Sequence, residues 1–246
     1  MKRHIFLLAV ALFFSVFTYG QTANDNQFKS EHTTSGMYIH AGPSFPLFDL
    51  SKNNPYDSSA GMAATGFHVE LGYSHQVTNN LGYKISSFYF GNKYSEKKYS
   101  NYFAGILGGG SSIANADGWS VGGFLVKPYF YVPITENITW EVYASAGFSA
   151  FYTPKYTRVS HATLPDTTVY YYYRDKSKGI SFAYGLGTQL NFKMFNTNLM
   201  VSADFLSIPI KYTATGIDIN NQSYSESIKS KLGYLSVNIG YIIYFK

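Results

Sequence analysis

The closing stretch of the chain, LGYLSVNIGYIIYFK, carries an apolar residue at every second position from Leu235 to Phe245. The residues between them include Ser236, Asn238 and Gly240. A period of two predicts a β-strand with two unlike faces. A soluble protein seldom ends on so long a strand with so apolar a face. The stretch therefore raises the question of what that face contacts.

Seven further stretches alternate in the same way, at residues 36–47, 64–78, 81–94, 119–134, 138–152, 179–192 and 198–212. Three of the connections, at 79–80, 135–137 and 194–197, are very short and rich in Asn, as tight hairpins require. The other four connections are long and carry Gly, Ser, Asn, Asp and Lys, at residues 48–63, 95–118, 153–178 and 213–227. Short turns and long loops thus alternate strictly along the chain.

This asymmetry is typical of bacterial outer-membrane barrels, which have short periplasmic turns, long outer loops and an even number of strands. A tilted strand crosses the membrane in about ten residues, which these stretches provide. An open sheet edge cannot be left unpaired in lipid, so the sheet must close. The predicted fold is all-β, an eight-stranded antiparallel up-and-down transmembrane β-barrel. The alternative is a soluble β-sandwich or lipocalin-like barrel, in which the apolar positions would point inward.

The N-terminus has the three parts of a secretory signal peptide: Lys2 and Arg3, an apolar run from Ile5 to Phe17, and small residues before a cut after Gly20. A retained N-terminal anchor is the alternative, although the run is short for a membrane span. We expect a signal peptide at 1–20, a flexible segment at 21–34 and the barrel at 35–246. The formal charge of +5 includes Lys2 and Arg3 and gives no reason to expect nucleic acid as a partner. The chain has no cysteine, which excludes disulfides, thiolate catalysis and a lipoprotein anchor.

The residue types on each strand indicate which face points inward. Charged residues share one face with Gly and Ser, and a Lys or Arg in mid-membrane facing lipid costs about 2–4 kcal/mol. The economical solution places them inside a narrow barrel, where the carboxylates can pair with the lysines. An eight-stranded barrel is filled by side chains, which argues against a diffusion pore. The predicted structural network comprises His40, His68, Glu70, Lys84, Lys127, Glu141 and Asp204.

With these features the chain resembles the OmpA/OmpX-like outer-membrane barrel family, especially the "porin family" barrels of Bacteroidota. The resemblance is carried by YIHAGPSFPL, NNLGYKIS, ENITWEVYASAGF and LSVNIGYIIYF. It implies an integral protein of the Gram-negative outer membrane. It also implies that the barrel-insertion machinery recognises the C-terminal strand through an aromatic end, which Phe245 matches, with Lys246 following it. We expect no peptidoglycan-binding domain after the barrel.

The motifs specify architecture better than chemistry. LGGGSS lacks the Lys-Ser/Thr pair of a P-loop, and the His residues show no metal-ligand spacing. We therefore expect no catalytic, cofactor-binding or metal-binding residues, and a monomer whose loops contact an unidentified ligand or surface. A lipid-modifying enzyme is one alternative, because His68, Glu70 and Ser74 share a face, as do His40 and Ser44. Transport of a small hydrophobic solute, or a role in secretion, is another. The tyrosines at 170–173 indicate either a headgroup boundary or a β-hairpin that extends above the membrane.

Overall fold

The computed structural model describes residues 35–54, 57–99, 111–161, 169–194, 197–218 and 220–245. The predicted signal peptide, the segment 21–34 and Lys246 lie outside these ranges. The described residues contain a short 3-10 helix, η1 (Asp49–Ser51), and eleven strands. The strands are β1 (Ser35–Phe48), β2 (Gly66–Gln76), β3 (Leu81–Asn92), β4 (Ser111–Ala116), β5 (Trp119–Pro133), β6 (Ile138–Tyr152), β7 (Tyr156–His161), β8 (Val169–Arg174), β9 (Lys178–Met194), β10 (Thr197–Ile217) and β11 (Ser223–Phe245).

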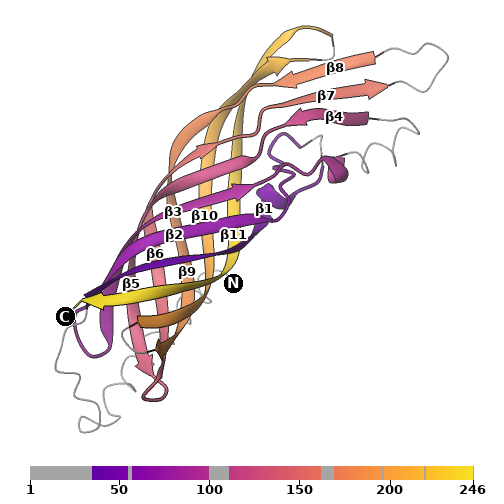
Figure 1. Cartoon of the computed structure of the whole chain (residues 1–246). Coiled ribbons are helices and arrows are strands. Elements are labelled where there is room, and N and C mark those ends of the chain that lie inside the picture. The colour runs from indigo at the N-terminus through magenta and orange to yellow at the C-terminus, as the bar shows by residue number, and fades with distance from the viewer. Residues whose placement is uncertain are drawn as a thin grey trace, which may run out of the picture. The chain divides into compact units, whose positions relative to one another are not determined.

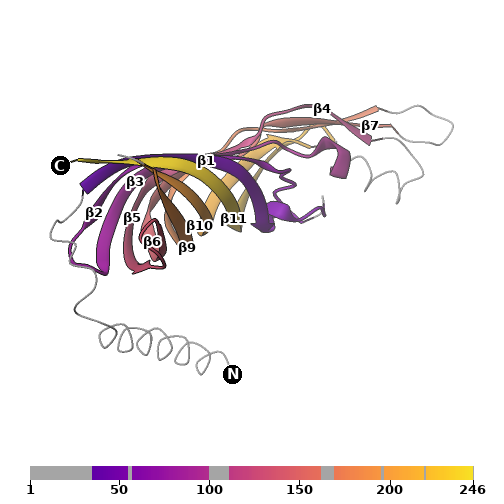
Figure 2. The same cartoon turned by 60° about the horizontal axis from the view of Figure 1, so that its bottom comes forward.

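Eight of these strands close into a ring. The order β1-β2-β3-β5-β6-β9-β10-β11 is antiparallel throughout, and β11 returns to pair with β1 (Figures 1 and 2). The closing register joins Ser35 to Phe245 and Phe48 to Leu232, so the last strand pairs along the whole of the first. The predicted fold class is confirmed.

The outer face of the ring is apolar. On β11 the exposed fractions of the alternating side chains run from 39% at Leu235 to 60% at Ile239, whereas Ser236 and Asn238 are buried. Other large apolar side chains that are about half exposed or more include Ile39, Phe67, Leu71, Ile85, Phe124, Val126, Phe148, Ile180 and Leu186. Such a continuous apolar surface is unfavourable in water and is what a lipid-facing barrel requires. Among the described residues, no helix has the length and hydropathy needed to cross a membrane.

Strands β10 and β11 continue past this apolar belt. They have 21 and 23 residues, about twice what a membrane span needs, and they pair as far as Ile217 and Ser223. In this part the outward residues before the terminal Ile217 are polar: Lys211, Thr213 and Thr215 on β10, and Ser225, Ser227, Lys229 and Lys231 on β11. We call it the extramembrane part of the sheet.

The prediction of a long loop at 213–227 was therefore wrong. The two strands are joined by a tight turn in which Asp218 Oδ1 accepts hydrogen bonds from the backbone N–H groups of Asn220 and Gln222 at 2.9 and 2.8 Å. Asn221 has a φ of 59°, a left-handed conformation that Asn tolerates well. The polar outward residues of this hairpin resemble a loop in composition, although their period of two is that of a strand.

The predicted loops 95–118 and 153–178 also contain strands. β7 pairs with β4 on one side and with β8 on the other, and β8 joins β10 through Gly216↔Arg174 and Ile217↔Tyr173. These three strands extend the sheet beyond the ring (Figure 1). Of the two interpretations of 170–173, the structure has the hairpin.

Candidate functional site

All seven residues predicted for the interior network lie inside the ring. Their exposed fractions are between 1% and 8%, so each is removed from both water and lipid. Each stands on the face opposite the apolar belt because side chains alternate along a strand. A buried charge is costly unless it is paired. The partners of these groups therefore decide whether the interior is stable.

Glu70 on β2 is the centre of one half of the network. Its Oε2 accepts a hydrogen bond from Lys127 Nζ at 2.7 Å, and its Oε1 accepts one from the Tyr38 hydroxyl at 2.7 Å. The Nε2 atoms of His40 and His68 lie 3.5 and 3.7 Å from Oε2. Four groups from three strands thus converge on one carboxylate.

Asp204 on β10 completes this half. Its Oδ1 lies 3.4 Å from Lys127 Nζ and accepts a hydrogen bond from the Tyr143 hydroxyl at 2.7 Å. Its Oδ2 accepts hydrogen bonds from Ser202 Oγ and Asn238 Nδ2 at 3.0 and 2.9 Å. Both oxygens are therefore satisfied, as a buried carboxylate requires.

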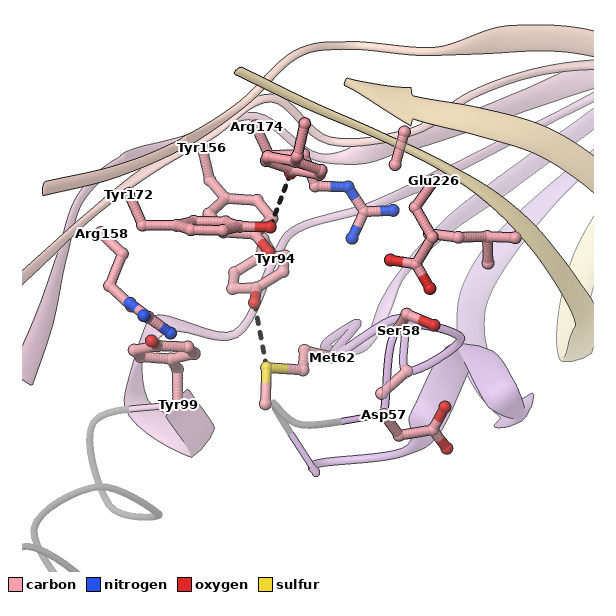
Figure 3. A pocket seen from close by; sticks show the side chains of 14 residues that line it. Asp57, Ser58, Met62, Tyr94, Tyr99, Tyr156, Arg158, Tyr172, Arg174 and Glu226 are labelled. Atoms are coloured by element: carbon pink, nitrogen blue, oxygen red, sulfur yellow. Dashed lines mark hydrogen bonds between the residues drawn. The ribbon is translucent and has the colours of Figure 1, made fainter. Parts of the chain in front are cut away.

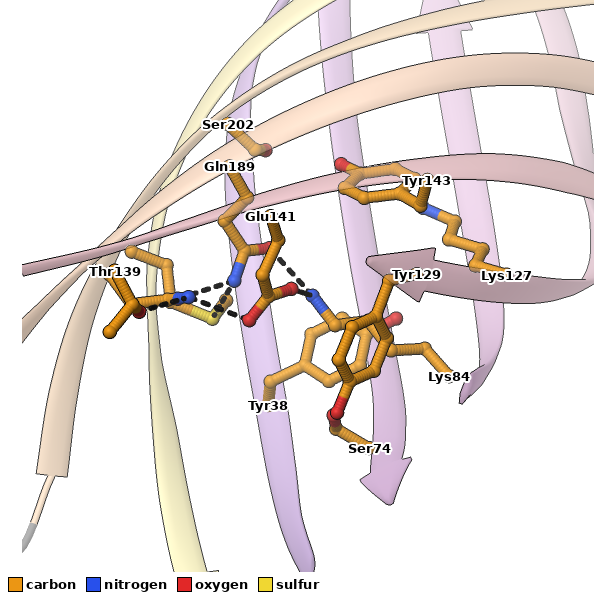
Figure 4. Close-up of polar contacts among 12 residues, drawn as sticks. Tyr38, Ser74, Lys84, Lys127, Tyr129, Thr139, Glu141, Tyr143, Gln189 and Ser202 are labelled. Atoms are coloured by element: carbon orange, nitrogen blue, oxygen red, sulfur yellow. Dashed lines mark hydrogen bonds and ion pairs between the residues drawn. The ribbon is translucent and has the colours of Figure 1, made fainter. Parts of the chain in front are cut away.

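Lys84 on β3 forms the second half of the network (Figure 4). Its Nζ donates to Glu141 Oε2 and, at 3.0 Å, to Gln189 Oε1. Asn191 Nδ2 donates to the other oxygen of Glu141 at 2.6 Å. The ammonium group also lies 5.3–5.4 Å from the centres of three tyrosine rings, those of Tyr38, Tyr129 and Tyr143. The negative faces of these rings stabilise the cation in the interior.

Glycines on neighbouring strands make room for these three rings. Each tyrosine stands directly across from a glycine, in the pairs Tyr38↔Gly72, Tyr129↔Gly82 and Tyr143↔Gly187. A Cβ atom at Gly187 would lie 2.2 Å from the Tyr143 ring. The rings therefore lie flat over the backbone of the adjacent strand, which only glycine allows there.

The Tyr143 ring also contacts both ammonium groups. Lys84 and Lys127 are direct cross-strand partners, an arrangement in which like charges repel. The two Nζ atoms lie 5.3 and 5.1 Å from the centre of the Tyr143 ring. Lys84 turns to Glu141 and Lys127 turns to Glu70 and Asp204, so each charge is compensated by a different carboxylate.

His40, His68 and Asp204 place potential metal-ligand atoms within 4.8 Å of one another. Both Nδ1 atoms already have partners: His40 Nδ1 lies 3.0 Å from Ser202 Oγ, and His68 Nδ1 lies 2.9 Å from Asn238 Oδ1. His40 Nε2 has no hydrogen bond but lies 3.5 Å from Glu70 Oε2. A cation bound there would also lie beside the Lys127 ammonium group, which repels it. The residues present fit a hydrogen-bonded network better than a metal site.

Little free space lies beside the charged centre of the network. The cavity beside His68, Glu70, Lys127 and Asp204 measures about 10 Å³, roughly the room of one water molecule. Ser74 Oγ donates to the Tyr129 hydroxyl and Ser44 Oγ to Asn92, so neither serine considered as a nucleophile contacts an imidazole. Ser236 Oγ lies 3.2 Å from His68 Nδ1, but Ser236 is fully buried.

A second site lies in the extramembrane part of the sheet (Figure 3). It is a cavity of about 270 Å³ between the sheet and the segments that follow η1 and β3. We call it the extramembrane pocket. It is lined by Asp57, Ser58, Ala60, Met62, Tyr94, Tyr99, Tyr156, Arg158, Tyr172, Arg174, Ala214, Tyr224, Glu226 and Ile228.

Cross-strand registers bring the polar lining residues together. Tyr224 pairs with Gly216, Gly216 with Arg174, and Arg174 with Tyr156, in one row across four strands. A Cβ atom at Gly216 would lie 1.9 Å from the Tyr173 carbonyl oxygen and 2.8 Å from the Tyr224 ring. Glycine at this position therefore allows β8 and the Tyr224 ring to approach β10.

Stacked rings form one wall of the pocket. Tyr94 stacks on Tyr156, Tyr156 on Tyr172, and Tyr172 on Tyr224, with ring centres 5.2–6.0 Å apart. Burial raises the pKa of Tyr94 and of Tyr172 above the ordinary tyrosine range, so both phenols are neutral at pH 7. Burial by itself lowers the pKa of Arg174, but contacts with Tyr212 and Tyr156 outweigh it, and the pKa lies above its usual value.

The sequence reasoning missed this pocket, although a signal was present. Tyr156-Thr-Arg158 and Tyr172-Tyr-Arg174 repeat the same Tyr-x-Arg spacing, and Tyr224 and Glu226 stand two apart in the same way. Residues two apart share one face of a strand. Recognising 153–178 as strands would have placed these side chains on one surface.

No protein-family model matches the sequence, and no curated protein matches it. Among solved structures, the fold is similar to a major outer membrane protein from Thermus thermophilus, with a TM-score of 0.50 and 10% identity over 86% of this chain and 99% of that chain. Neisserial surface protein A gives a TM-score of 0.48 with 9% identity, over 86% and 97% of the two chains. Ail of Yersinia pestis gives 0.40 with 16% identity, over 86% and 99%. By its fold, with an eight-stranded antiparallel ring, this chain is similar to the outer-membrane β-barrel from Thermus thermophilus.

Proposed function

We propose that the protein is a non-enzymatic integral barrel of the Gram-negative outer membrane whose extramembrane part contacts ligands or surfaces outside the cell. The observation that carries this proposal is the filled interior. Every predicted interior charge has a partner, and the cavity beside Glu70 measures only about 10 Å³. The ring therefore serves as an anchor, and the open site lies outside the membrane.

In this proposal the signal peptide at 1–20 directs export, and the barrel-insertion machinery recognises β11 through its aromatic end at Phe245. The short turns face the periplasm. The apolar belt contacts outer-membrane lipid, and the extramembrane part of β7, β8, β10 and β11 lies on the outer side. The barrel works as a monomer because the ring leaves none of its own edges unpaired.

Conductance in a planar bilayer tests the closed interior. The purified protein is expected to give no stable current steps. The matched variant Lys84→Ala/Glu141→Ala, which removes an ion pair and leaves space, is expected to leak. Folding of both proteins is checked by their shift in gel mobility on boiling. A stable current through the unaltered protein would contradict a plugged barrel.

A lipid-modifying enzyme is the second candidate, because Ser236 and His68 are in contact and His68 lies beside Glu70. The distance of 3.7 Å between His68 Nε2 and Glu70 Oε2 is longer than a base-orienting hydrogen bond. The Ser236→Ala and His68→Ala variants are expected to leave the lipid profile of the outer membrane unchanged. A lipid species lost in both variants, with the barrels still folded, would favour the enzyme.

A further inference from the structure

The extramembrane pocket holds a buried cation without an anionic partner. Arg174 is 9% exposed, and among the described residues no carboxylate oxygen lies within 4.0 Å of its guanidinium group. Its Nη2 donates to the Tyr212 hydroxyl at 2.6 Å, but Nε has no hydrogen-bond partner. The rings of Tyr156 and Tyr212 lie 5.9 and 5.5 Å from the guanidinium carbon and compensate the charge only in part. A buried arginine in this state is suited to receive a carboxylate.

An anion faces the same space. Glu226 on β11 lines the pocket, and in Figure 3 its carboxylate and the Arg174 guanidinium group point into one cavity. Neither a hydrogen bond nor an ion pair involves Glu226 among the described residues. On β10, Ala214 pairs with Glu226 and Gly216 pairs with Arg174. Arg174 and Glu226 are therefore two strands and two positions apart, which places their Cα atoms about 12 Å from each other. The two charges are therefore near each other and yet not paired.

Unpaired charges of this kind contrast with the interior network, in which Lys84 and Lys127 each contact a carboxylate. Two opposite charges that face one cavity without meeting are complementary to a ligand that carries both charges. Two further charges line the pocket, but Asp57 pairs with Lys52 and the Arg158 guanidinium group lies over the Tyr172 ring. The rest of the lining is Ser58 and tyrosine rings together with Met62, Ala60, Ala214 and Ile228, which suits an apolar or aromatic group. The volume of about 270 Å³ sets the size of that ligand at roughly one amino acid.

We propose that the extramembrane pocket binds a free α-amino acid with an apolar or aromatic side chain, its carboxylate on Arg174 and its ammonium group near Glu226. The tyrosine wall contacts the side chain. The inference rests on the proposed function only in that the pocket is placed outside the membrane, where such a solute can reach it.

Equilibrium dialysis of the folded protein in detergent with radiolabelled L-phenylalanine tests this proposal. Unlabelled 3-phenylpropionate, which lacks the ammonium group, and phenethylamine, which lacks the carboxylate, should compete at least about tenfold less well than unlabelled L-phenylalanine. The dipeptide L-alanyl-L-phenylalanine should also compete less well. Equal competition by either half-ligand, stronger competition by the dipeptide, or no saturable binding would overturn the proposal.

Three single variants assign the charges. Arg174→Gln should weaken binding at least about tenfold, because a buried charge-assisted bond is lost. Glu226→Gln should weaken it about threefold, since Glu226 is exposed. Lys176→Gln removes one positive charge from an exposed residue of the same segment and should change binding less than about twofold. Equal losses in the Arg174 and Lys176 variants would refute the site.

The gel-mobility shift on boiling is recorded for every variant. A folded barrel without amino-acid binding would overturn this inference alone. A protein that conducts ions or changes lipids would contradict the proposed function and leave the binding result to stand by itself.

Discussion

The barrel interior and the extramembrane pocket are built from the same kinds of residue, namely tyrosines, charged groups and cross-strand glycines, but they treat charge differently. Inside the ring each ammonium group contacts a carboxylate, and the cavity beside Glu70 measures about 10 Å³. In the extramembrane pocket Arg174 and Glu226 face about 270 Å³ of space without contacting each other.

The difference follows from the surroundings of the two regions. Lipid encloses the ring, so an unpaired charge there has no water to compensate it and the interior must be complete in itself. The extramembrane part is exposed to water on its outer face, which lets it keep polar groups available for a solute. In the proposed function, the paired charges inside the ring belong to an anchor, and the unpaired charges of the pocket belong to a binding site.

The largest effect is expected from Glu70→Ala. It leaves the Lys127 ammonium group without its closest carboxylate in a buried setting, and breaking such a pair costs about 3–5 kcal/mol of unfolding free energy. Urea unfolding in detergent, followed by gel mobility, measures this loss. The control is Lys52→Ala, whose side chain is 44% exposed and whose loss should cost at most about 1 kcal/mol. Similar losses in the two variants would mean that the interior network does not stabilise the barrel.

Gly187→Val should have the next largest effect. The new side chain would displace the Tyr143 ring, and overpacking of this kind costs about 1–3 kcal/mol. Gly122→Val is the matched change, because the nearest contact of its Cβ atom would be 3.2 Å rather than 2.2 Å. The same unfolding measurement should rank the Gly187 variant well below the Gly122 variant.

Gly216→Val separates the two regions. The new side chain would collide with the Tyr173 carbonyl oxygen and push β8 away from β10, which disrupts the row that holds Arg174. We expect binding of labelled L-phenylalanine to be lost and the unfolding free energy of the barrel to change by less than about 0.5 kcal/mol. A large loss of barrel stability would show that the extramembrane part is needed for the ring to fold.

The smallest effect concerns the edge of the pocket. Hydrogen bonds from Ser59 hold the pKa of Asp57 below its usual value, and Lys52 lies 3.0 Å from the same carboxylate. A lowered pKa means that this contact stabilises the loop above the ordinary aspartate pKa and is lost as the pH falls through the lowered value. Ser59→Ala should raise the pKa of Asp57 toward the ordinary range, as measured by NMR titration of the carboxyl carbon. An unchanged pKa would assign the shift to Lys52.

Much of the ring could be predicted because membrane strands have a strong signal. Alternation between large apolar and small polar residues, as from Leu235 to Phe245, identifies a strand and its lipid face together. The charged residues on the opposite face, such as Glu70 and Lys84, were predicted to point inward because exposing a charge to lipid is costly. The extramembrane strands were missed because Thr or Ser alternate there with small or aromatic residues. The two faces of such a strand differ little in hydrophobicity, and its composition resembles that of a loop.

The sequence by itself determined that this chain forms a closed, lipid-facing barrel and which face of each strand carries the charges, because both follow from a period of two and from the cost of charge in lipid. The tertiary structure alone decided the partners. Cross-strand registers direct Lys84 to Glu141 and Lys127 to Glu70 and Asp204, and they bring Arg174 into one row with Gly216 and Tyr224. These contacts join residues far apart along the chain, and the spacing of residues within one strand carries no information about the register between two.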